Sequence, residues 1–500
     1  MELLSLLSSA GIEFPDNIGS ITITQIVSDS RRACAGCLYV CIRGIHSDGH
    51  LFVKDAIDRG AAAVIIESGN ELALDNKALS ILVISVPNTR KALACLFNAW
   101  YGSPSAKMKF VAVTGTNGKT SVTHILKKIF ETALYRCGLV GTVSCLSMDR
   151  QLFSNDSSIQ ANMTTPDPDK LYCMLDRMAN DGVEYVFIEA SSHALELDKL
   201  CPIHFSAAIF TNITVDHLDF HGSMEKYIAA KKKLFAMSDL TVVNMDSKYY
   251  NDIVCASSSR VVSCSESSRN ADYCAIDVVD HGIAGSSYTL ISSGTVIKLK
   301  CQLPGRFNIM NTLQAAVCAI ELGISPTLIA KAVASVTGIE GRMEKIKLRS
   351  NIGFSVFIDY AHTPDALENL LSAVRGFCSS KQRIIVLFGC GGARDKSKRP
   401  IMGEIATRLA DFAVITSDNC RDEAPDEIIN DILKGIYGRD NYTVIVDRKS
   451  AIEQTIRNAT YGDVIILAGK GHEKYEINQF GRVPFSEKQI VLDEVKKIDI

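Results

Sequence analysis

The chain has 500 residues, of which 47% are hydrophobic and 22% charged, a soluble globular composition that allows a large core. Its length suggests about three domains, because a single core does not grow to this size. The formal net charge of −3 gives no general attraction to nucleic acid or anionic lipid, and no apolar run reaches the length of a membrane span.

The chain begins with Met1-Glu-Leu-Leu-Ser-Leu-Leu7, which has neither a basic leader nor a small-residue cleavage site. We expect a short amphipathic helix here instead of a secretory signal, and therefore a cytoplasmic protein. Sixteen cysteines are scattered along the chain, which does not favour a disulfide framework. Cys34 and Cys37 have C-x₂-C spacing, but no second pair with zinc spacing follows, so we interpret them as core or loop thiols.

Residues 1–105 are predicted to form a small α/β domain. Three strands are expected, over residues 38–42, 63–66 and 81–86. A helix is expected over residues 52–59. Polar loops that contain serine, aspartate or glycine follow strands at residues 28–31 and 44–50, and such loops either hold a ligand or are ordinary turns. Residues 101–106, Tyr-Gly-Ser-Pro-Ser-Ala, are predicted to form a linker.

The stretch Lys109-Phe-Val-Ala-Val-Thr-Gly-Thr-Asn-Gly-Lys-Thr-Ser121 predicts a buried strand, a glycine turn and a helix. Backbone N–H groups and the helix dipole at such a turn form a phosphate site. Gly115 and Gly118 let the backbone approach an anion, and Lys119 adds a positive charge. Val113 stands where the strict phosphate-loop pattern has glycine, and the alternative is a tight turn with a surface lysine. We interpret the stretch as a nucleotide-phosphate site.

Polar clusters also follow two strands of the predicted central domain, residues 106–340. A strand over residues 185–189 ends in the acid Glu189 and runs into a Ser-Ser-His segment, and a strand over residues 207–211 leads into the polar residues 212–221. Ligands of doubly wound folds bind at the carboxyl ends of parallel strands, where both clusters and the phosphate loop fall. One acid at a strand end can simply cap a helix, but this combination predicts an active site.

Residues 341–500 repeat the strand–helix rhythm and predict a second open parallel sheet. Five strands are expected, over residues 356–358, 384–388, 412–415, 444–446 and 464–467. Polar segments follow four of them, at residues 359–365, 389–396, 417–421 and 469–473. The predicted fold class is therefore α/β with three domains: a small N-terminal α/β domain, a central phosphate-loop doubly wound ATPase domain and a C-terminal Rossmann-like domain.

Five polar segments stand in a fixed order along the chain. They are Thr114-Gly-Thr-Asn-Gly-Lys-Thr120, Glu189-Ala-Ser-Ser-His193, Thr211-Asn212 with Asp216-His217, Gly341-Arg-Met-Glu344 and Asp359-Tyr-Ala-His-Thr-Pro-Asp365. In this order they resemble the Mur ligases of peptidoglycan synthesis, and the resemblance covers residues 27–486. It is strongest to the members that add the third amino acid to UDP-N-acetylmuramoyl-L-alanyl-D-glutamate. The joint occurrence of these segments is far more specific than the phosphate loop alone.

The resemblance implies an ADP-forming ligase that uses ATP and Mg²⁺. Such enzymes activate the terminal carboxylate of the substrate as an acyl phosphate, which the incoming amine attacks as phosphate leaves. Phosphoryl transfer needs positioning and charge neutralisation more than covalent help from the protein. The residues that would contact ATP are Gly115, Thr116, Asn117, Gly118, Lys119, Thr120, Asn308, Asn311, Arg342 and Asp359. For Asn308 and Asn311 the alternative is capping of a helix after Gly305.

The resemblance also implies a catalytic and metal-binding set. The catalytic residues would be Lys119, Glu189, His217 and Lys231. Thr120 and Glu189 would hold one Mg²⁺, and His217 would hold a second together with Lys231 as a carbamate. Carbamylation requires a neutral amine, so the site must lower the pKa of that lysine. The alternative is that Lys231 belongs to a solvated basic stretch, an interpretation that we accept for the two lysines after it.

The UDP-muramoyl end of the substrate would lie in the N-terminal domain and the peptide end in the central domain. The implied contacts are Ser30, Gly44, His46, Thr164, Thr165, Ser191 and Lys199. The family often has glutamine and arginine after the Ser-Ser-His segment, where this chain has Leu197 and Lys199. Lys199 can hold a carboxylate or phosphate as a point charge but lacks the bidentate fork of arginine. Leu197 cannot hydrogen-bond and is not a candidate.

The C-terminal domain would select the third amino acid. meso-Diaminopimelate presents a distal carboxylate and ammonium and lysine only an ammonium, so a pocket for the former needs an arginine and an acid. The residues expected there are Arg394, Asp418, Asn419, Arg421, Gly469 and Glu473. The signature of the diaminopimelate-adding members has proline where this chain has Cys420. Because proline stiffens a loop, selectivity over lysine stays open.

Two other interpretations remain. A folylpolyglutamate-type synthetase shares the core and the chemistry, but its phosphate loop usually has Gly-Lys-Gly-Ser and it lacks a domain like residues 1–105. A nucleotide-binding regulatory protein would have lost some of the four catalytic residues, and none is missing. We expect a monomer that binds UDP-N-acetylmuramoyl-L-alanyl-D-glutamate and meso-diaminopimelate, with no nucleic acid partner and no membrane insertion.

Overall fold

The computed structural model describes residues 1–15, 19–44, 47–70, 81–152, 164–349, 352–379 and 381–498. The chain forms two units. The first comprises residues 1–112, 135–208 and 230–240, and the second comprises residues 113–134, 209–229 and 241–500. Within the described ranges, no helix combines the length and the apolar character needed to cross a bilayer. Parallel sheets and helices alternate along the chain, which confirms the predicted α/β class.

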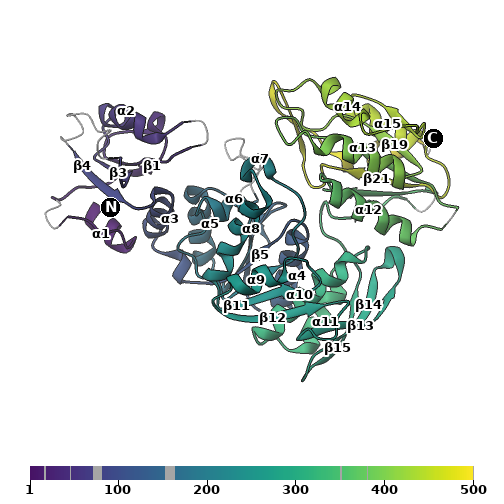
Figure 1. Ribbon diagram of the computed structural model, residues 1–500, viewed down its shortest axis with the longest axis horizontal. Helices are drawn as coiled ribbons and strands as arrows, with labels where there is room; N and C mark the ends of the chain where they lie inside the picture. The colour runs from purple at the N-terminus through teal and green to yellow at the C-terminus, as the bar shows by residue number, and fades with distance from the viewer. Residues whose placement is uncertain are drawn as a thin grey trace. The chain divides into compact units, whose positions relative to one another are not determined.

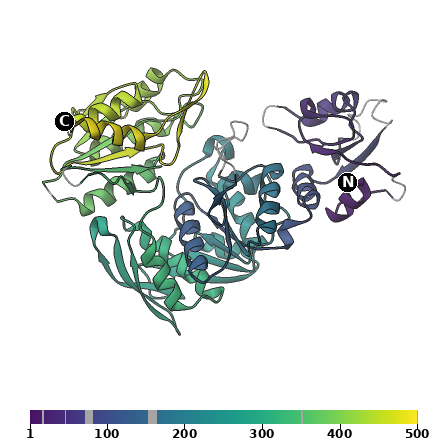
Figure 2. The same cartoon turned by 180° about the vertical axis from the view of Figure 1, so that it is seen from behind.

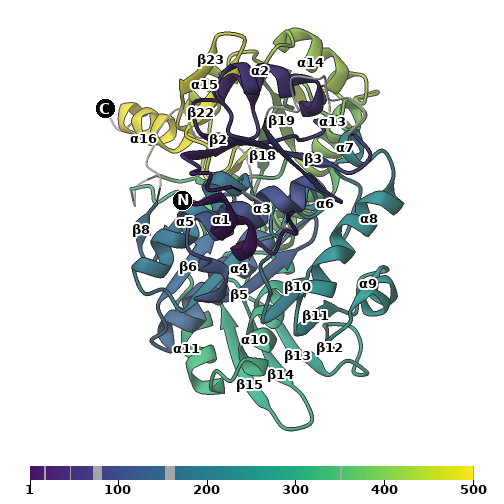
Figure 3. The same cartoon turned by 90° about the vertical axis from the view of Figure 1, so that its left-hand side faces the viewer.

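The first unit begins with a four-stranded parallel sheet in the order β1 (Gln25–Val27), β2 (Cys37–Val40), β3 (Ala63–Glu67) and β4 (Leu82–Val86). The strands β2 and β3 are apolar and buried on both faces, as parallel strands covered by helices are. α2 (Val53–Asp58) covers one face, and α1 (Leu3–Ser9) with α3 (Thr89–Trp100) lies on the other (Figure 3). Leu3, Leu6 and Leu7 are fully buried, which confirms the expected amphipathic helix.

The rest of the first unit contains the predicted strand over residues 185–189. That strand is β9 (Tyr185–Glu189), and it pairs in parallel with β6 (Cys137–Val140). β7 (Cys145–Ser147) and β8 (Arg150–Gln151) continue from β6 in antiparallel pairing. The helices here are α5 (Pro168–Asn180) and α6 (Ser192–Glu196). Short 3₁₀ helices are η1 (Ser30–Arg32), η2 (Gly49–Phe52), η5 (Pro104–Ala106) and η6 (Lys233–Met237).

The boundary between the units falls within several elements, of which α8 (Met224–Lys232) carries the predicted site residue Lys231. The others are β5 (Lys109–Thr114), β10 (Ala207–Phe210) and β11 (Leu240–Asn244). α4 (Lys119–Thr132), which follows the phosphate loop, and α7 (Leu218–His221) belong to the second unit. The end of β5 and the start of α4 therefore confirm the predicted strand, turn and helix.

The second unit also contains a sheet segment that begins in the serine-rich residues 255–270, where the sequence predicts loops around short peripheral strands. Its strands are neighbours in the order β12 (Arg260–Ser265), β13 (Tyr273–Asp280), β14 (Ser286–Ile291) and β15 (Val296–Cys301), antiparallel from β13 onward. α10 (Phe307–Glu321) and α11 (Pro326–Ser335) pack against it (Figure 1). α9 (Tyr250–Ala256) and the 3₁₀ helix η7 (Gly282–Ala284) complete this part.

The C-terminal part of the second unit confirms the second open parallel sheet. Its order is β16 (Glu344–Lys345), β17 (Ser355–Asp359), β21 (Val464–Ala468), β18 (Ile384–Phe388), β19 (Phe412–Ile415) and β20 (Tyr442–Val444), with β16 alone antiparallel to its neighbour in this sheet. The strand expected over residues 444–446 begins two residues earlier, because pairing with β19 starts at Tyr442.

Helices cover both faces of this sheet. α12 (Pro364–Phe377), α13 (Lys398–Leu409) and α14 (Pro425–Leu433) pack on one face (Figure 1). α15 (Arg448–Arg457) and α16 (Glu487–Ile498), the latter in yellow, pack on the other (Figure 2). A hairpin of β22 (Tyr475–Asn478) and β23 (Gly481–Pro484) follows β21. The loops that follow β18, β19 and β21 are anchored in buried strands.

Candidate active site

The predicted phosphate loop connects β5 to α4. Gly115 has a φ of +151° and Gly118 a φ of +90°, conformations that favour glycine. A Cβ atom on Gly115 would lie 1.9 Å from Thr211 Oγ1, and one on Gly118 would lie 2.5 Å from Asn311 Oδ1. Both positions therefore require glycine for backbone conformation and for space.

Two cationic side chains lie at the start of α4. Lys119 Nζ donates to the carbonyl oxygens of Gly115 and Thr116, both at 2.8 Å. Thr120 is buried, and its Oγ1 accepts a hydrogen bond from Arg342 Nη2 at 2.9 Å. The N-terminus of a helix favours an anion through its free N–H groups and its dipole. The loop thus combines a helix N-terminus, a lysine and an arginine, as a phosphate site requires.

Residues that follow β10 hold the phosphate loop in place. The carbonyl of Asn212 accepts the N–H of Thr116 at 2.9 Å, and its Oδ1 accepts the N–H of Asn117 at 2.9 Å. Thr211 Oγ1 donates to the carbonyl of Asn117 at 2.6 Å. The expected meeting of this polar strand end with the phosphate loop is therefore present in the structure.

Arg342 is positioned by the end of β17. Its guanidinium lies over the ring of Tyr360, 4.7 Å from the centroid. Asp359 accepts the N–H groups of Met343 and Ala361, both at 2.7 Å. Burial raises the pKa of the Asp359 carboxyl, although Arg342 and these two N–H groups act in the opposite direction. Asp359 thus fixes the backbone on both sides of it, including the segment that carries Arg342.

Asp365, at the start of α12, contacts the phosphate loop, although the sequence did not assign it a role. Its Oδ2 accepts from Asn117 Nδ2 at 2.7 Å and from Thr214 Oγ1 at 3.3 Å. The signal was present, because Asp365 closes the segment Asp359-Tyr-Ala-His-Thr-Pro-Asp365, but no role followed from the residue type alone.

Asn308 and Asn311 lie buried on the first turns of α10. Asn308 Nδ2 donates to the carbonyl of Pro304 at 2.8 Å, and Asn311 Nδ2 donates to Asn308 Oδ1 at 3.0 Å. A capping side chain instead accepts from a free N–H group of the helix, and the N-cap of α10 is Arg306, which makes no such bond. The helix-capping alternative is therefore wrong, and Asn311 lies against Gly118 of the phosphate loop.

His217 stands at the start of α7 with a φ of +53°. Its Nε2 is 3.4 Å from Asp216 Oδ2. Burial opposes ionisation of Asp216, but His217, His362 and Lys398 outweigh it and hold the pKa of this carboxyl below its usual value. Burial and Lys398 lower the pKa of His362 to about 4, so that its imidazole is neutral at pH 7. An ionised carboxylate thus stands beside His217.

Glu189, the last residue of β9 in the first unit, is fully buried. Its Oε1 accepts the N–H of Thr142 at 3.0 Å, and its Oε2 accepts the hydroxyl of the same residue at 2.8 Å. That hydroxyl also lies 3.1 Å from Thr164 Oγ1. Gly141 packs so closely that a Cβ atom on it would be 2.3 Å from Oε1. The carboxylate is therefore held in one orientation.

The predicted peptide-binding residues cluster next to Glu189. Thr165 Oγ1 donates to the carbonyl of Glu189 at 2.7 Å and lies 3.2 Å from Ser191 Oγ. Lys199 is buried and its Nζ lies 2.7 Å from Asp167 Oδ1. The lysine that replaces the expected arginine is therefore engaged by an acid of the loop that also carries Thr165.

The residues predicted for the UDP end lie in the four-stranded part of the first unit. Ser30 is buried in η1, which is capped by Asp29. Gly44 follows β2, and a Cβ atom on it would lie 2.9 Å from the carbonyl oxygen of Ser47. His46 lies outside the described residues.

Lys231 lies near the end of α8 with 1% of its surface exposed, whereas Lys233 is exposed and its Nζ lies 2.8 Å from Glu196 Oε2. Because Lys231 is buried, it does not belong to the solvated basic stretch that was the alternative interpretation. Lys231 belongs to the first unit. The other predicted metal ligands are Glu189 in the first unit and Thr120 and His217 in the second.

The loops after β19 and β21 carry most of the residues that the sequence predicts for the amino-acid site. Asn419 Nδ2 donates to Glu473 Oε2 at 2.7 Å, and its Oδ1 accepts from Lys470 Nζ at 3.0 Å. Lys470, which the sequence analysis missed, is fully buried and lies 3.3 Å from Asp418 Oδ1. Burial opposes ionisation of Asp418, but Lys470 and Arg448 outweigh it and lower its pKa. Burial and Asp418 raise the pKa of Glu473.

Arg421 closes this loop with a φ of +53°. Its Nη1 donates to the carbonyl of Gly392 at 2.7 Å, and its backbone N–H donates to the carbonyl of Ile477 at 3.1 Å. Burial and the charge of the exposed Arg394 lower the pKa of Arg421, so two guanidinium groups act on one another here. Cys420 is buried in the core. The loop is thus fixed by hydrogen bonds and packing although it lacks the family's proline.

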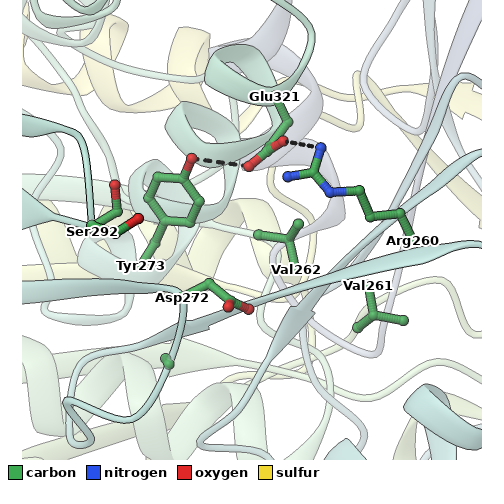
Figure 4. A pocket seen from close by; sticks show the side chains of 9 residues that line it. Arg260, Val261, Val262, Asp272, Tyr273, Ser292 and Glu321 are labelled. Atoms are coloured by element: carbon green, nitrogen blue, oxygen red, sulfur yellow. Dashed lines mark hydrogen bonds and ion pairs between the residues drawn. The ribbon is translucent and has the colours of Figure 1, made fainter.

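A separate cavity of about 400 Å³ lies between β12, β13 and the end of α10, and none of the predicted site residues lines it (Figure 4). Arg260 and the hydroxyl of Tyr273 converge on Glu321, at 2.8 Å and 2.9 Å. This cluster anchors the end of the helix whose first turns carry Asn308 and Asn311.

Three family models match the chain. The model described as "Mur ligase family, catalytic domain" matches residues 22–101, the "Mur ligase middle domain" residues 113–319, and the "Mur ligase, glutamate ligase domain" residues 341–471. Among curated proteins, the UDP-N-acetylmuramoyl-L-alanyl-D-glutamate–2,6-diaminopimelate ligase of Clostridium perfringens is 40% identical over 497 residues, which are 99% of each chain.

The chain is also similar to solved structures of Mur ligases. A structure titled as a UDP-N-acetylmuramoyl-L-alanyl-D-glutamate–2,6-diaminopimelate ligase has a TM-score of 0.68, 28% identity and full coverage of both chains. The folylpolyglutamate synthase of Mycobacterium tuberculosis, complexed with ADP, has a TM-score of 0.61 and 16% identity, over 76% of this chain and 91% of that one. At that identity the second likeness shows a common fold alone.

Proposed function

Since the chain belongs to the Mur ligase family, we propose that it is an ATP-dependent, ADP-forming ligase that adds meso-diaminopimelate to UDP-N-acetylmuramoyl-L-alanyl-D-glutamate. The observation that carries this proposal is the 40% identity over 99% of both chains with a relative named for that reaction. We further propose that the chain acts as a monomer in the cytoplasmic synthesis of peptidoglycan precursors.

In this proposal ATP lies at the start of α4. Lys119 and Arg342 supply positive charge to its phosphates, and the backbone N–H groups of the helix N-terminus supply hydrogen bonds. Asn308 and Asn311 contact the nucleotide from α10, and Asp359 keeps Arg342 in place. Transfer of the terminal phosphoryl group to the substrate carboxylate gives an acyl phosphate and ADP, and the attacking amine then releases phosphate.

The donor set also suits Mg²⁺, which prefers oxygen ligands. The hydroxyl of Thr120 and the carboxylate of Glu189 are such ligands. Thr142 donates to both oxygens of Glu189 and holds this carboxylate in one orientation. The metal would neutralise charge on the phosphates. We propose His217 and a carbamylated Lys231 for a second ion, because burial of Lys231 favours the neutral amine that carbamylation needs.

In this proposal residues 1–105 bind the UDP-muramoyl group and residues 341–500 bind the incoming amino acid. Ser30, Gly44 and His46 would contact the UDP-muramoyl group. The peptide end would contact Thr164, Thr165, Ser191 and Lys199, which surround Glu189 or pair with the neighbouring loop. Residues 106–340 would carry the ATP chemistry.

The amino-acid site suits diaminopimelate better than lysine. Arg421 and Arg394 influence one another, so a carboxylate placed between them relieves their repulsion. Asn419, Asp418 and Glu473 supply acceptors for an ammonium group, and Gly469 lies at the end of β21 beside Asp418. Lysine would leave the arginine pair without an anion.

The test is ATP-dependent phosphate release with UDP-N-acetylmuramoyl-L-alanyl-D-glutamate and Mg²⁺, compared between meso-diaminopimelate, L-lysine and no amino acid. We expect turnover with diaminopimelate alone. Equal turnover with lysine would keep the ligase but contradict the role of the arginine pair. Turnover only with a folate and glutamate would favour a folylpolyglutamate-type synthetase, and ATP binding without turnover of any substrate would favour a regulatory protein.

A further inference from the structure

Two half-buried thiols that the proposed reaction does not use face one another in the first unit. Cys95 lies on α3, and Cys201 lies in the turn after α6, 106 residues later. Their sulfur atoms are 3.8 Å apart, and both thiols are free. A disulfide places two sulfur atoms about 2.0 Å apart, so small side-chain rotations would close the gap.

The segments on which these thiols lie are fixed to one another. Asn88, the N-cap of α3, accepts the N–H of Lys91 at 2.9 Å and donates through Nδ2 to Asp198 Oδ2 at 2.9 Å. The hydroxyl of Tyr172 donates to the carbonyl of Cys201. These hydrogen bonds therefore hold the two sulfur atoms close to one another.

The surroundings also give the two thiols different reactivity. A hydrogen bond from Cys95 and the ammonium of Lys91 lower the pKa of the Cys201 thiol, against the effect of burial. The same contact and burial raise the pKa of Cys95. The thiolate is the form that attacks peroxides, and a neighbouring thiol then resolves the oxidised sulfur.

We propose that Cys95 and Cys201 form a site of reversible disulfide formation by peroxides. The sulfur of Cys201 attacks one oxygen of hydrogen peroxide, the O–O bond breaks, and a sulfenic acid and one water form. The sulfur of Cys95 then attacks the sulfur of Cys201, the S–O bond breaks, and a second water leaves. The two thiols lose two electrons and two protons, and one peroxide is reduced to two waters. A dithiol reductant reverses the reaction by thiol–disulfide exchange.

The bond would link residues that already lie together, so it would preserve the native structure. It would also constrain the unfolded chain, because it closes a loop of about 106 residues. The midpoint of thermal unfolding should therefore rise on oxidation, and the rise should disappear in Cys95→Ser. A fall of the midpoint on oxidation would mean that the disulfide distorts the native structure, and it would contradict the proposal.

The test uses the reduced full-length protein, treated with a small molar excess of hydrogen peroxide, quenched with N-ethylmaleimide and digested without reductant. We expect a linked Cys95–Cys201 peptide pair in mass spectra, in more than half of the molecules. Cys95→Ser should remove it and leave a sulfenic acid on Cys201 that dimedone traps.

The exposed Cys255 provides the matched control. Cys255→Ser should leave the yield of the linked pair unchanged. The proposal fails if Cys201 is recovered as the alkylated thiol while Cys255 is oxidised. It also fails if the Cys95–Cys201 pair is no more abundant than random pairs among the sixteen cysteines.

Discussion

Gly115→Ala tests the geometry of the phosphate loop most sharply. The new methyl carbon would stand 1.9 Å from Thr211 Oγ1, at a backbone φ of +151°. Thr211 cannot move away freely, because its hydroxyl donates to the carbonyl of Asn117 at 2.6 Å. The substitution therefore strains the backbone, creates a clash and breaks a hydrogen bond that shapes the loop.

The size of the effect follows from these three terms. Backbone strain at a positive φ costs about 1–3 kcal/mol. Overpacking costs about 1–3 kcal/mol, and loss of the hydrogen bond about 1 kcal/mol. The sum of roughly 3–7 kcal/mol corresponds to a loss of at least roughly a hundredfold in kcat/KM for ATP, even if relaxation of the loop recovers part of it.

The assay is steady-state phosphate release at varied ATP, together with the unfolding midpoint. Alanine substitutions at two other glycines serve as controls for backbone strain and for the added methyl group. Gly323 has a φ of +90° and Gly376 has an ordinary helical position, and a Cβ atom on either meets nothing within 4 Å. We expect both alanine variants to keep wild-type kcat/KM for ATP. The reasoning is refuted if Gly115→Ala also stays within threefold of the wild type.

Three further predictions concern single residues. Lys119→Ala should abolish acyl phosphate formation in a phosphate-release assay, since no other side chain of the loop carries its charge, and near-normal turnover would refute the assignment. Arg421→Ala should raise the KM for diaminopimelate at least tenfold and leave that for ATP within threefold; an equal loss in both would make the residue structural. His362, whose pKa is lowered to about 4, favours folding above pH 6.5 and loses this contribution as pH falls from 6.5 to 4, because the unfolded chain binds the proton first. Between pH 7 and pH 5 the urea midpoint of His362→Gln should therefore fall less than that of the wild type, and equal falls would contradict the lowered pKa.

The sheet of the C-terminal part was predictable because continuous apolar runs are bounded by polar loops. β18 and β19 coincide with the predicted residues 384–388 and 412–415. The antiparallel strands β14 and β15 were missed although their burial alternates residue by residue, as half-exposed strands require. That signal was present in the sequence, but short strands in a serine-rich region resemble loops.

The site was predictable as a set of motifs and not as a set of contacts. The bond between Arg342 and Thr120 and that between Asn117 and Asp365 join residues more than 200 positions apart, which only the folded chain brings together. Lys470 was not predicted as a site residue because a lysine is usually exposed. Here its ammonium group is buried and donates to three oxygen atoms. Local pattern thus gives the type of chemistry, and tertiary packing decides which partners carry it.

The central claim is that this chain activates the substrate's carboxylate with ATP before diaminopimelate attacks it. The most direct measurement uses UDP-N-acetylmuramoyl-L-alanyl-D-glutamate with ¹⁸O in the glutamyl carboxylates, and mass analysis of the released phosphate. The account predicts one ¹⁸O atom per phosphate, formed together with ADP and the tripeptide product. Phosphate without ¹⁸O would mean that ATP is hydrolysed by water, and it would contradict the account.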